Sequence, residues 1–131
     1  RFRTGDLIRL TATERCSCGR GAPRFRVIGR TDEMIVIRGV NAFPSVVAAA
    51  VNACPELNGE YRIRLSHPPP YDRLPLEVEL VQGHEASDAL CEALSRRLGN
   101  TLRLGVALTV LASGTLARTE GKTRRLIKEY A

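Results

Sequence analysis

The sequence predicts a small α+β domain, in which an antiparallel sheet is packed with two to three helices and preceded by a β-hairpin. Three observations lead to this fold class: short stretches that alternate apolar and polar residues, segments with helical periodicity, and turn-forming residues between them. The chain has 131 residues, which suits one domain, or one small domain with an extra segment. Apolar residues make up 44% of it, which is enough for a hydrophobic core.

The first third of the chain predicts loops and strands. Residues 1–21 are rich in Gly, Thr and Cys and predict loops with short strands. Apolar runs at 25–28 and 34–37 predict two strands, and the turn-forming Gly29-Arg30-Thr31-Asp32 lies between them. We expect a hairpin here, with a hinge-like turn.

Two segments have the periodicity of helices. The first helix is expected to begin at Pro44, because proline is tolerated at the first helical position, and to end before Pro55. The second is expected over residues 87–98, where one face is leucine-rich, and Gly99-Asn100 provides a stop signal.

The remaining elements form the expected sheet. Residues 61–65 and 76–80 alternate in polarity and predict two half-buried strands, antiparallel to each other. Residues 106–110 predict a third strand, which a loop over 112–121 follows. Residues 122–130 predict a short amphipathic helix. We expect the predicted helices to cover one face of the sheet.

The charge of the chain favours small anionic partners. The net charge is +6, with an isoelectric point near 9.7, which attracts anions over long range. Aromatic residues are only 5% and Trp is absent, so platforms for stacking on single-stranded nucleic acid are scarce. The basic residues are also dispersed. We therefore expect nucleotides or the phosphates of coenzyme A as ligands, and no nucleic acid.

Nothing in the sequence predicts an association with membranes. No apolar run approaches the roughly 20 residues that span a bilayer, and no secretory leader is present, so we expect a cytoplasmic protein. The chain begins with Arg1 rather than Met, from which we expect a fragment of a longer protein.

Two of the four cysteines form a candidate metal site. Cys16 and Cys18 are close enough in sequence to bind one zinc ion, but a structural zinc takes four ligands. The others would come from another domain, or from His67 or His84. We favour a reduced pair on a loop, because Cys-x-Cys is an incomplete zinc pattern. The remaining two, Cys54 and Cys91, are expected to be small buried apolar residues.

Three short motifs occur in a suggestive order. They are Thr4-Gly5-Asp6, Gly29-Arg30-Thr31-Asp32 and Gly121-Lys122. Each alone is as well explained by a turn or a solvated loop. Together, in this order and spacing, they resemble the adenylate-forming superfamily of acyl-CoA ligases, adenylation domains and luciferases.

Two further segments narrow the resemblance to one branch. The stretch 35–45, which includes Arg38-Gly39-Val40-Asn41-Ala42-Phe43-Pro44-Ser45, is similar to the corresponding hairpin of phenylacetate–CoA ligases. Cys16-Ser17-Cys18-Gly19-Arg20 resembles a Cys-x-Cys-Gly-Arg of the same branch. The resemblance covers essentially the whole chain and implies the small C-terminal lid domain of such an enzyme.

The resemblance implies roles for three residues in adenylation. In that half-reaction a carboxylate attacks the α-phosphate of ATP and pyrophosphate leaves. Lys122 would contact the acyl and phosphoryl oxygens, where negative charge builds up. Asp6 would accept hydrogen bonds from the ribose hydroxyls of AMP, and Arg30 would contact the ribose or a phosphate.

The resemblance also implies a rotation between two half-reactions. Asp32 would be the hinge about which the lid turns, so that residues 1–31 end the large domain and cross over, and residues 32–131 form the lid. After the rotation, Arg38 and Gly39 would face coenzyme A, whose thiol attacks the acyl carbon and releases AMP.

These implications require parts that the sequence does not contain. ATP or AMP, Mg²⁺ and coenzyme A would all bind with the help of an N-terminal domain that carries the phosphate loop and the pocket for a small aryl acid. We therefore expect the chain alone to be inactive. Two alternatives remain open: the lid of an enzyme that loads an aryl acid onto a carrier protein, and a non-catalytic basic α+β binding module. The sequence leaves a homodimer open as well.

Overall fold

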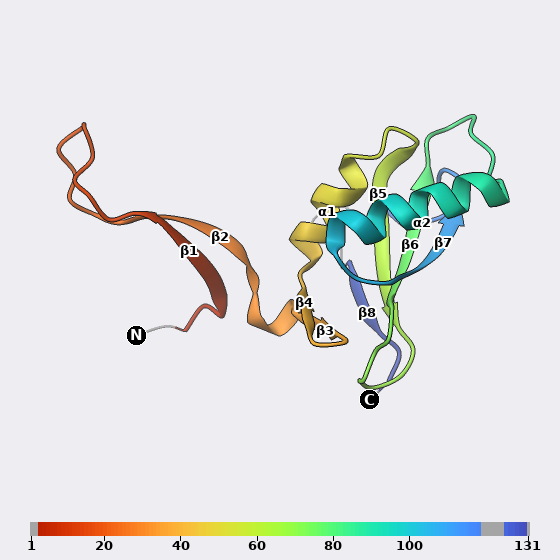
Figure 1. Ribbon diagram of the computed structural model, residues 1–131, viewed down its shortest axis with the longest axis horizontal. Helices are drawn as coiled ribbons and strands as arrows, with labels where there is room; N and C mark the ends of the chain where they lie inside the picture. Colours follow the sequence, from red (N-terminus) through yellow and green to blue (C-terminus); the bar gives the residue numbers. More distant parts are fainter. Residues whose placement is uncertain (1–2, 119–124, 131) are drawn as a thin grey trace.

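The computed structural model describes residues 3–118 and 125–130. It divides into an arm, residues 3–30, and a body, residues 31–118 with 125–130. The arm projects to one side of the body, and the loop at its tip lies farthest from the body (Figure 1). The body contains both α-helices and the large sheet. The α+β class expected from the sequence is therefore confirmed.

The arm is a hairpin of two antiparallel strands, β1 (Asp6–Ala12) and β2 (Arg24–Arg30). Its register shifts twice, between Leu7 and Ile8 and between Leu10 and Ala12. No described helix or further strand covers it, so its large apolar side chains are exposed to between 49% and 60%: Ile8, Leu10, Phe25 and Val27. A two-stranded hairpin of this kind is marginally stable in water on its own.

A short 3-10 helix, η1 (Thr31–Glu33), joins the arm to a second small hairpin. This hairpin pairs β3 (Ile35–Ile37) with β4 (Val40–Ala42). Both apolar runs expected as strands are therefore strands, but they do not pair with each other. The expected single hairpin is wrong, because each run finds a closer partner in its own neighbouring segment.

The large sheet has the order β7-β6-β5-β8 and is mixed. Its central strands, β5 (Leu57–Leu65) and β6 (Leu74–Leu80), are antiparallel as expected. The edge strand β7 (Val106–Leu111) runs parallel to β6. A parallel neighbour needs a crossover, and the helix between β6 and β7 provides it.

Of the helix expected over residues 122–130, the structure describes residues 125–130, and these contain a strand and no helix. β8 (Leu126–Lys128) runs parallel to β5, with Ile63 opposite Leu126 and Leu65 opposite Lys128. The free edge of β5 offers unpaired backbone groups, and a segment too short to sustain a helix gains more by pairing with them.

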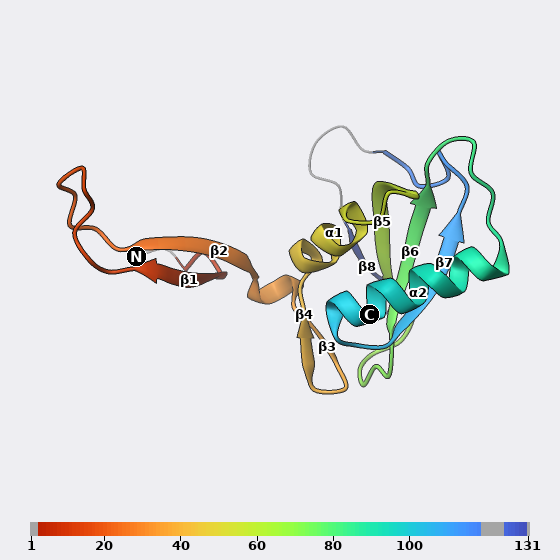
Figure 2. The same ribbon diagram turned by 45° about the horizontal axis from the view of Figure 1, so that its top comes forward.

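Two helices lie on the same face of the sheet, α1 (Pro44–Asn52) and α2 (Asp88–Leu102) (Figure 2). Pro44 occupies the first turn of α1, and Ser87 caps α2 by accepting a hydrogen bond from the backbone of Leu90 at 3.2 Å. No helix among the described residues has the length and the apolar character to cross a membrane.

The second helix continues one turn beyond the expected stop at Gly99-Asn100. Leu98 and Leu102 are both buried and lie one turn apart on the same face, so extending the helix buries a further leucine. That gain, about 2 kcal/mol, exceeds the cost of about 1 kcal/mol for a glycine in a helix. The helix ends where Arg103 adopts a left-handed conformation, with φ of 56°.

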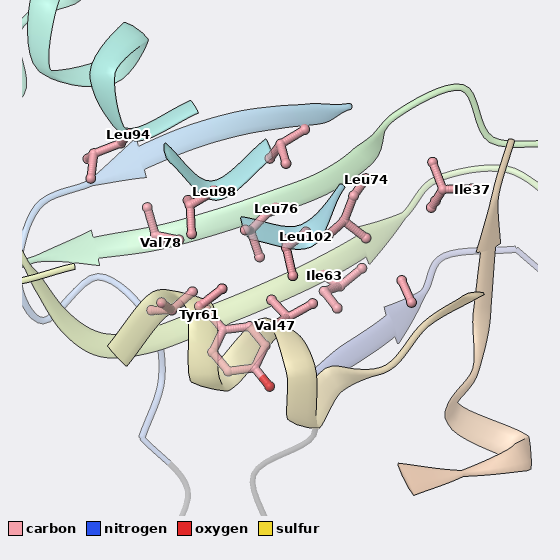
Figure 3. Packing of buried hydrophobic residues seen from close by; sticks show 14 of the residues in the cluster. Ile37, Val47, Tyr61, Ile63, Leu74, Leu76, Val78, Leu94, Leu98 and Leu102 are labelled. Atoms are coloured by element: carbon pink, nitrogen blue, oxygen red, sulfur yellow. The ribbon is translucent and has the colours of Figure 1, made fainter. Parts of the chain in front are cut away.

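The core lies between the helices and the sheet (Figure 3). Alternate residues of β5 and β6 point into it and meet leucines from α2 and valines from α1. Cys54 is buried there as expected, whereas Cys91 is only half-buried. The side chains that are exposed by less than 2% include Ile37, Val47, Val51, Ile63, Leu74, Leu76, Val78, Leu80, Leu94 and Leu98.

Candidate functional site

Three of the residues that the motifs single out meet where the arm joins the body. The guanidinium of Arg30 donates two parallel hydrogen bonds to the carboxylate of Asp32, each 3.0 Å long, through Nε and Nη2. Its Nη1 lies 3.6 Å from Oδ1 of Asp6. Arg30 therefore bridges two carboxylates that are far apart in the sequence.

Local backbone contacts bring these residues together. The register of the arm places Asp6 directly opposite Arg30. The next residue, Thr31, donates its backbone N–H at 2.8 Å and its hydroxyl at 3.1 Å to the carbonyl of Gly5. Gly5 has a φ of +77°, a conformation that other residues rarely adopt. The Thr-Gly-Asp turn is thus tied to the start of η1.

The three charges stabilise one another while remaining accessible to solvent. The hydrogen bonds and charge of Asp32 raise the pKa of Arg30 above its ordinary value. In turn, the hydrogen bond from Arg30 lowers the pKa of Asp32. Because exposed ion pairs contribute little to stability, the guanidinium can exchange a carboxylate for an anionic ligand at small cost.

The arm also contacts the body closely just before this cluster. A Cβ atom built on Gly29 would lie 2.8 Å from Cδ1 of Phe43, so the Phe43 ring packs directly on the glycine backbone. The hydroxyl of Ser45 donates a 2.6 Å hydrogen bond to the carbonyl of Ile28. Phe43 and Ser45 belong to the motif that resembles phenylacetate–CoA ligases, and their contacts with the arm were not foreseen from the sequence.

Arg38 and Gly39 form the tip of the β3–β4 hairpin. Their φ angles are 47° and 84°, so both central residues of the turn are left-handed, as in a type I′ turn. Such a conformation is costly for an arginine and is retained where the surroundings enforce it. Here the backbone N–H of Arg38 donates to the carbonyl of Tyr71 at 3.1 Å, and both turn residues are exposed to solvent.

Tyr71 supports this tip from inside the body. Its ring is buried, and its hydroxyl lies 2.8 Å from the carbonyl of His67 and 2.9 Å from the hydroxyl of Tyr130. Burial, followed by the hydrogen bond with Tyr130, raises the pKa of Tyr71 to about 12. The sequence offers no signal for this role, because Tyr71 lies in a proline-rich loop.

A basic hollow opens beside the same loop. It has a volume of about 780 Å³ and lies between the end of α2 and the starts of β6 and β7. Three arginines line it, Arg73, Arg96 and Arg103, together with Glu92. None of the three forms an ion pair with any residue that the structure describes, whereas the neighbouring Arg97 pairs with Glu56 at 2.8 Å. The hollow therefore suits an anion.

Lys122 lies outside the described residues, but the nearest described segments on either side of it are bonded to the sheet. On its carboxyl side, Arg125 donates to Oε2 of Glu60 at 2.6 Å and to the carbonyl of Tyr61 at 3.0 Å. The guanidinium of Arg125 also stacks 4.9 Å above the Tyr61 ring. On its amino side, the loop that follows β7 is bonded to a buried carboxylate, Glu79.

Cys16 and Cys18 lie in the loop at the tip of the arm. Hydrogen bonds from Cys18, first from its backbone and then from its thiol, lower the pKa of Cys16 to about 7. His67 and His84 belong to loops of the body, from which the arm projects away (Figure 1). In residues 3–118 and 125–130, no three His, Cys, Asp or Glu side chains are grouped as metal ligands. The two histidines therefore do not complete a site with this pair.

Comparison with known proteins decides the family. Residues 39–129 match the family model of the AMP-binding enzyme C-terminal domain. The chain belongs to this family. The resemblance inferred from the motifs is thereby confirmed.

Curated relatives of this AMP-binding enzyme C-terminal domain are longer proteins. It is 34% identical to the phenylacetate-coenzyme A ligase of Thermus thermophilus, over 97% of this chain and 33% of that protein. It is 30% identical to the phenylacetate-coenzyme A ligase of Escherichia coli, over 96% of this chain and 29% of that protein. The chain thus spans about a third of the length of these relatives.

Solved structures of one relative distinguish two arrangements of the domain. The chain superposes on a 2-hydroxyisobutyryl-CoA ligase in the postadenylation state with a TM-score of 0.82, at 33% identity over 95% of this chain and 28% of that one. For the same ligase in the thioesterification state the TM-score is 0.64, at 34% identity over 96% of this chain and 28% of that one. Since identity and coverage barely change, the two scores differ because the relative's conformation differs.

Proposed function

We propose that this chain is the C-terminal lid of an AMP-forming ligase that joins an aryl acid similar to phenylacetate to coenzyme A. Residues 1–31 end the large domain and cross over, and residues 32–131 rotate as the lid. The observation that carries the proposal is the better superposition on the postadenylation state than on the thioesterification state of one related ligase. The higher score supports an arm and a body that are arranged as they are around the first half-reaction. The relative's second conformation supports a rotation of the body to another arrangement.

In the first half-reaction, Lys122 neutralises oxygens that gain negative charge. The acid attacks the α-phosphate of ATP, the bond to pyrophosphate breaks, and an acyl-adenylate forms. A lysine is a compact charge on a flexible stem, which suits contact with acyl and phosphoryl oxygens. Donors placed where charge develops contribute about 2–4 kcal/mol to the transition state. The Gly121-Lys122 motif supports this role.

Asp6 and Arg30 hold the nucleotide. The carboxylate of Asp6 is partly exposed, with 34% of the side chain accessible. It accepts hydrogen bonds from the two vicinal hydroxyls of the ribose. Arg30 sits 3.6 Å from it and offers its planar donors to ribose or phosphate oxygens. The contact between the two residues supports a shared ligand at this point.

Asp32 is the hinge. It lies in η1, the short turn with which the body begins after the arm, and few backbone angles need to change there for the body to rotate. The Arg30–Asp32 ion pair spans the joint. Because this pair is exposed and weak, it restrains the rotation only slightly.

The second half-reaction uses the end of the body that carries Arg38 and Gly39. Coenzyme A brings several phosphates, and the arginines of the basic hollow, Arg73, Arg96 and Arg103, supply positive charge that no described carboxylate pairs. The tip and the hollow are linked through one loop, because Arg38 is bonded to Tyr71 and Arg73 follows two residues later. The thiol then attacks the acyl carbon and AMP leaves.

An N-terminal domain completes the site. The exposed apolar side chains of the arm, such as Leu10 and Phe25, need a partner surface, and the length of the relatives leaves room for one. Mg²⁺ is expected to accompany ATP. The described residues contain no cluster of metal ligands, so this part of the chain does not hold that ion by itself.

The test is release of pyrophosphate with ATP and a series of aryl acids. The full-length enzyme is expected to release it with at least one acid and to form a thioester with coenzyme A. The isolated chain is expected to be inactive. Clear turnover by the isolated chain would refute the proposal, and acyl transfer to a carrier protein in place of coenzyme A would redirect it to the loading enzymes.

A further inference from the structure

Glu79 is a buried carboxylate for which the proposed reaction has no use. It lies on β6 and its residue is 0% exposed. Its side chain projects from the sheet face opposite the helices, because Val78 and Leu80 on either side of it face the core. A buried charge is costly unless hydrogen bonds compensate it, so its partners explain why it is retained.

Three donors converge on Glu79, and two of them come from one loop. Oε2 accepts from Nδ2 of Asn58 at 2.8 Å and from the backbone N–H of Gly114 at 3.0 Å. Oε1 accepts from the backbone N–H of Leu116. Burial by itself raises the pKa of Glu79, but the hydrogen bonds from Asn58, Leu116 and Gly114 outweigh it and leave the pKa below its ordinary value. The carboxylate therefore stays ionised at neutral pH.

A bulge in β5 aims Asn58 at this carboxylate. The register of β5 shifts between Leu57 and Tyr61, and Gly59 has a φ of +88°. Oδ1 of Asn58 accepts the backbone N–H of Glu60 at 2.9 Å, which leaves Nδ2 to face Glu79. Bulges commonly re-aim a side chain in this way. The orientation of Asn58 is thus fixed at both ends of its amide.

These contacts anchor the chain that leads to Lys122. Glu79 binds backbone N–H groups, so it fixes the path of the main chain itself at Gly114 and Leu116. The side chain of Leu116 is buried, with 5% exposure, and Lys122 follows six residues later. Arg125 provides a second anchor three residues beyond the lysine. Among the described residues before the lysine, the nearest one paired in the sheet is Leu111, at the end of β7.

We propose that Glu79 is a positioning residue for adenylation, which fixes the approach of the chain to Lys122 and acts only through that lysine. The inference rests on the function proposed for Lys122 above. It assigns Glu79 to one half-reaction: the second half-reaction does not use Lys122 and does not need the anchor.

A carboxylate on the same strand provides a matched control. Glu77 lies on the same face of β6, and its oxygens bind Arg62 at 2.6 Å and Arg64 at 3.2 Å. None of its described contacts reaches the loop that contains Gly114. Glu77→Gln therefore makes the same chemical change as Glu79→Gln without touching the anchor.

The experiment measures both half-reactions in the full-length enzyme. Adenylation is followed by exchange of pyrophosphate into ATP, and thioester formation is followed from supplied acyl-adenylate and coenzyme A. Glu79→Gln is expected to lower the adenylation rate about 10- to 100-fold, the loss typical of a displaced catalytic group, with thioester formation within about twofold. Glu77→Gln is expected to change neither by more than about twofold.

A double variant shows whether Glu79 acts through the lysine. Lys122→Ala combined with Glu79→Gln is expected to be no slower in adenylation than Lys122→Ala alone, since a positioning residue has no effect once its target is gone. The inference would be overturned if the two substitutions slowed adenylation independently, so that the double variant was slower than Lys122→Ala. Equal loss of both half-reactions in Glu79→Gln would also overturn it, and neither result would contradict the proposed function. Normal adenylation in Lys122→Ala would instead reject the function.

A milder variant serves if Glu79→Gln does not fold. Asn58→Ala removes one donor and leaves both loop hydrogen bonds to Glu79 in place. It is expected to lower adenylation about threefold, with thioester formation unchanged, as fits the loss of one hydrogen bond of ordinary strength. An unchanged adenylation rate in this folded variant would count against the anchor.

Discussion

The arm and the body of this chain are stabilised in different ways. In the body, two helices and a four-stranded sheet enclose a core in which many apolar side chains are exposed by less than 2%. In the arm, Leu10 and Phe25 are more than half exposed, and the ion pair at its base is open to solvent. The difference shows that the body has a core of its own, whereas no described residue of the arm belongs to that core.

The first prediction challenges this comparison with two apolar truncations in the isolated chain. Ile63→Ala removes a fully buried side chain of β5 and is expected to lower the free energy of unfolding by about 2–5 kcal/mol. Leu10→Ala in the arm is expected to change it by less than about 0.5 kcal/mol. Urea denaturation of both variants measures the two values, and similar losses would contradict the division.

The second prediction concerns the joint between the two regions. In the full-length enzyme, Asp32→Pro is expected to slow thioester formation about 100-fold and to spare adenylation, because proline restricts the backbone at the hinge. Rates of the two half-reactions measure the effect. An enzyme with Asp32→Pro that completes the second step at the normal rate would show that the body turns about another residue.

The third prediction addresses the contact between the arm and Phe43. Gly29→Ala places a methyl group 2.8 Å from the Phe43 ring, and the resulting overpacking is expected to cost about 1–3 kcal/mol locally. Because the core of the body contains no residue of the arm, hydrogen exchange should accelerate in β2 and stay unchanged in β5. Gly21→Ala is the control, since nothing lies within 4 Å of its added methyl group. Faster exchange across both regions would show that they unfold together.

The smallest effect is expected on the stability of the chain when the pH is lowered. The pKa of Glu79 is lowered in the folded chain, so its contribution to stability is present above the unfolded pKa of about 4.3 and is lost as the pH falls. Glu79→Gln should therefore reduce the loss of stability between pH 7 and pH 3. Asp32→Asn should leave that loss nearly unchanged, because its ion pair is exposed. Unfolding at both pH values tests this, and a larger change for Asp32→Asn would contradict it.

Most helices and strands of the body were predictable from sequence, since they follow local rules. Pro44 began α1 as expected, and the alternation in residues 61–65 and 76–80 identified the central strands. The segment 126–128 could not be assigned from its own pattern, because its state depends on the free edge of β5. The same holds for α2, whose last turn depends on the burial of Leu102.

The site was predictable in part and for a similar reason. The motifs named Asp6, Arg30 and Asp32, and the structure brings all three together. Glu79 was missed because alternation along β6 predicts that it faces solvent. Only the fold shows that the loop after β7 covers that face. Residues that act through long-range backbone contacts leave no local pattern in a sequence.

The central claim is that one cation, carried by a rotating body, serves adenylation alone. The most direct measurement compares both half-reactions in the full-length enzyme with Lys122→Ala. Adenylation is expected to fall about 100- to 1,000-fold, as for the loss of a group that stabilises developing charge, while thioester formation from supplied acyl-adenylate stays within about twofold. Equal losses in the two half-reactions would contradict the account.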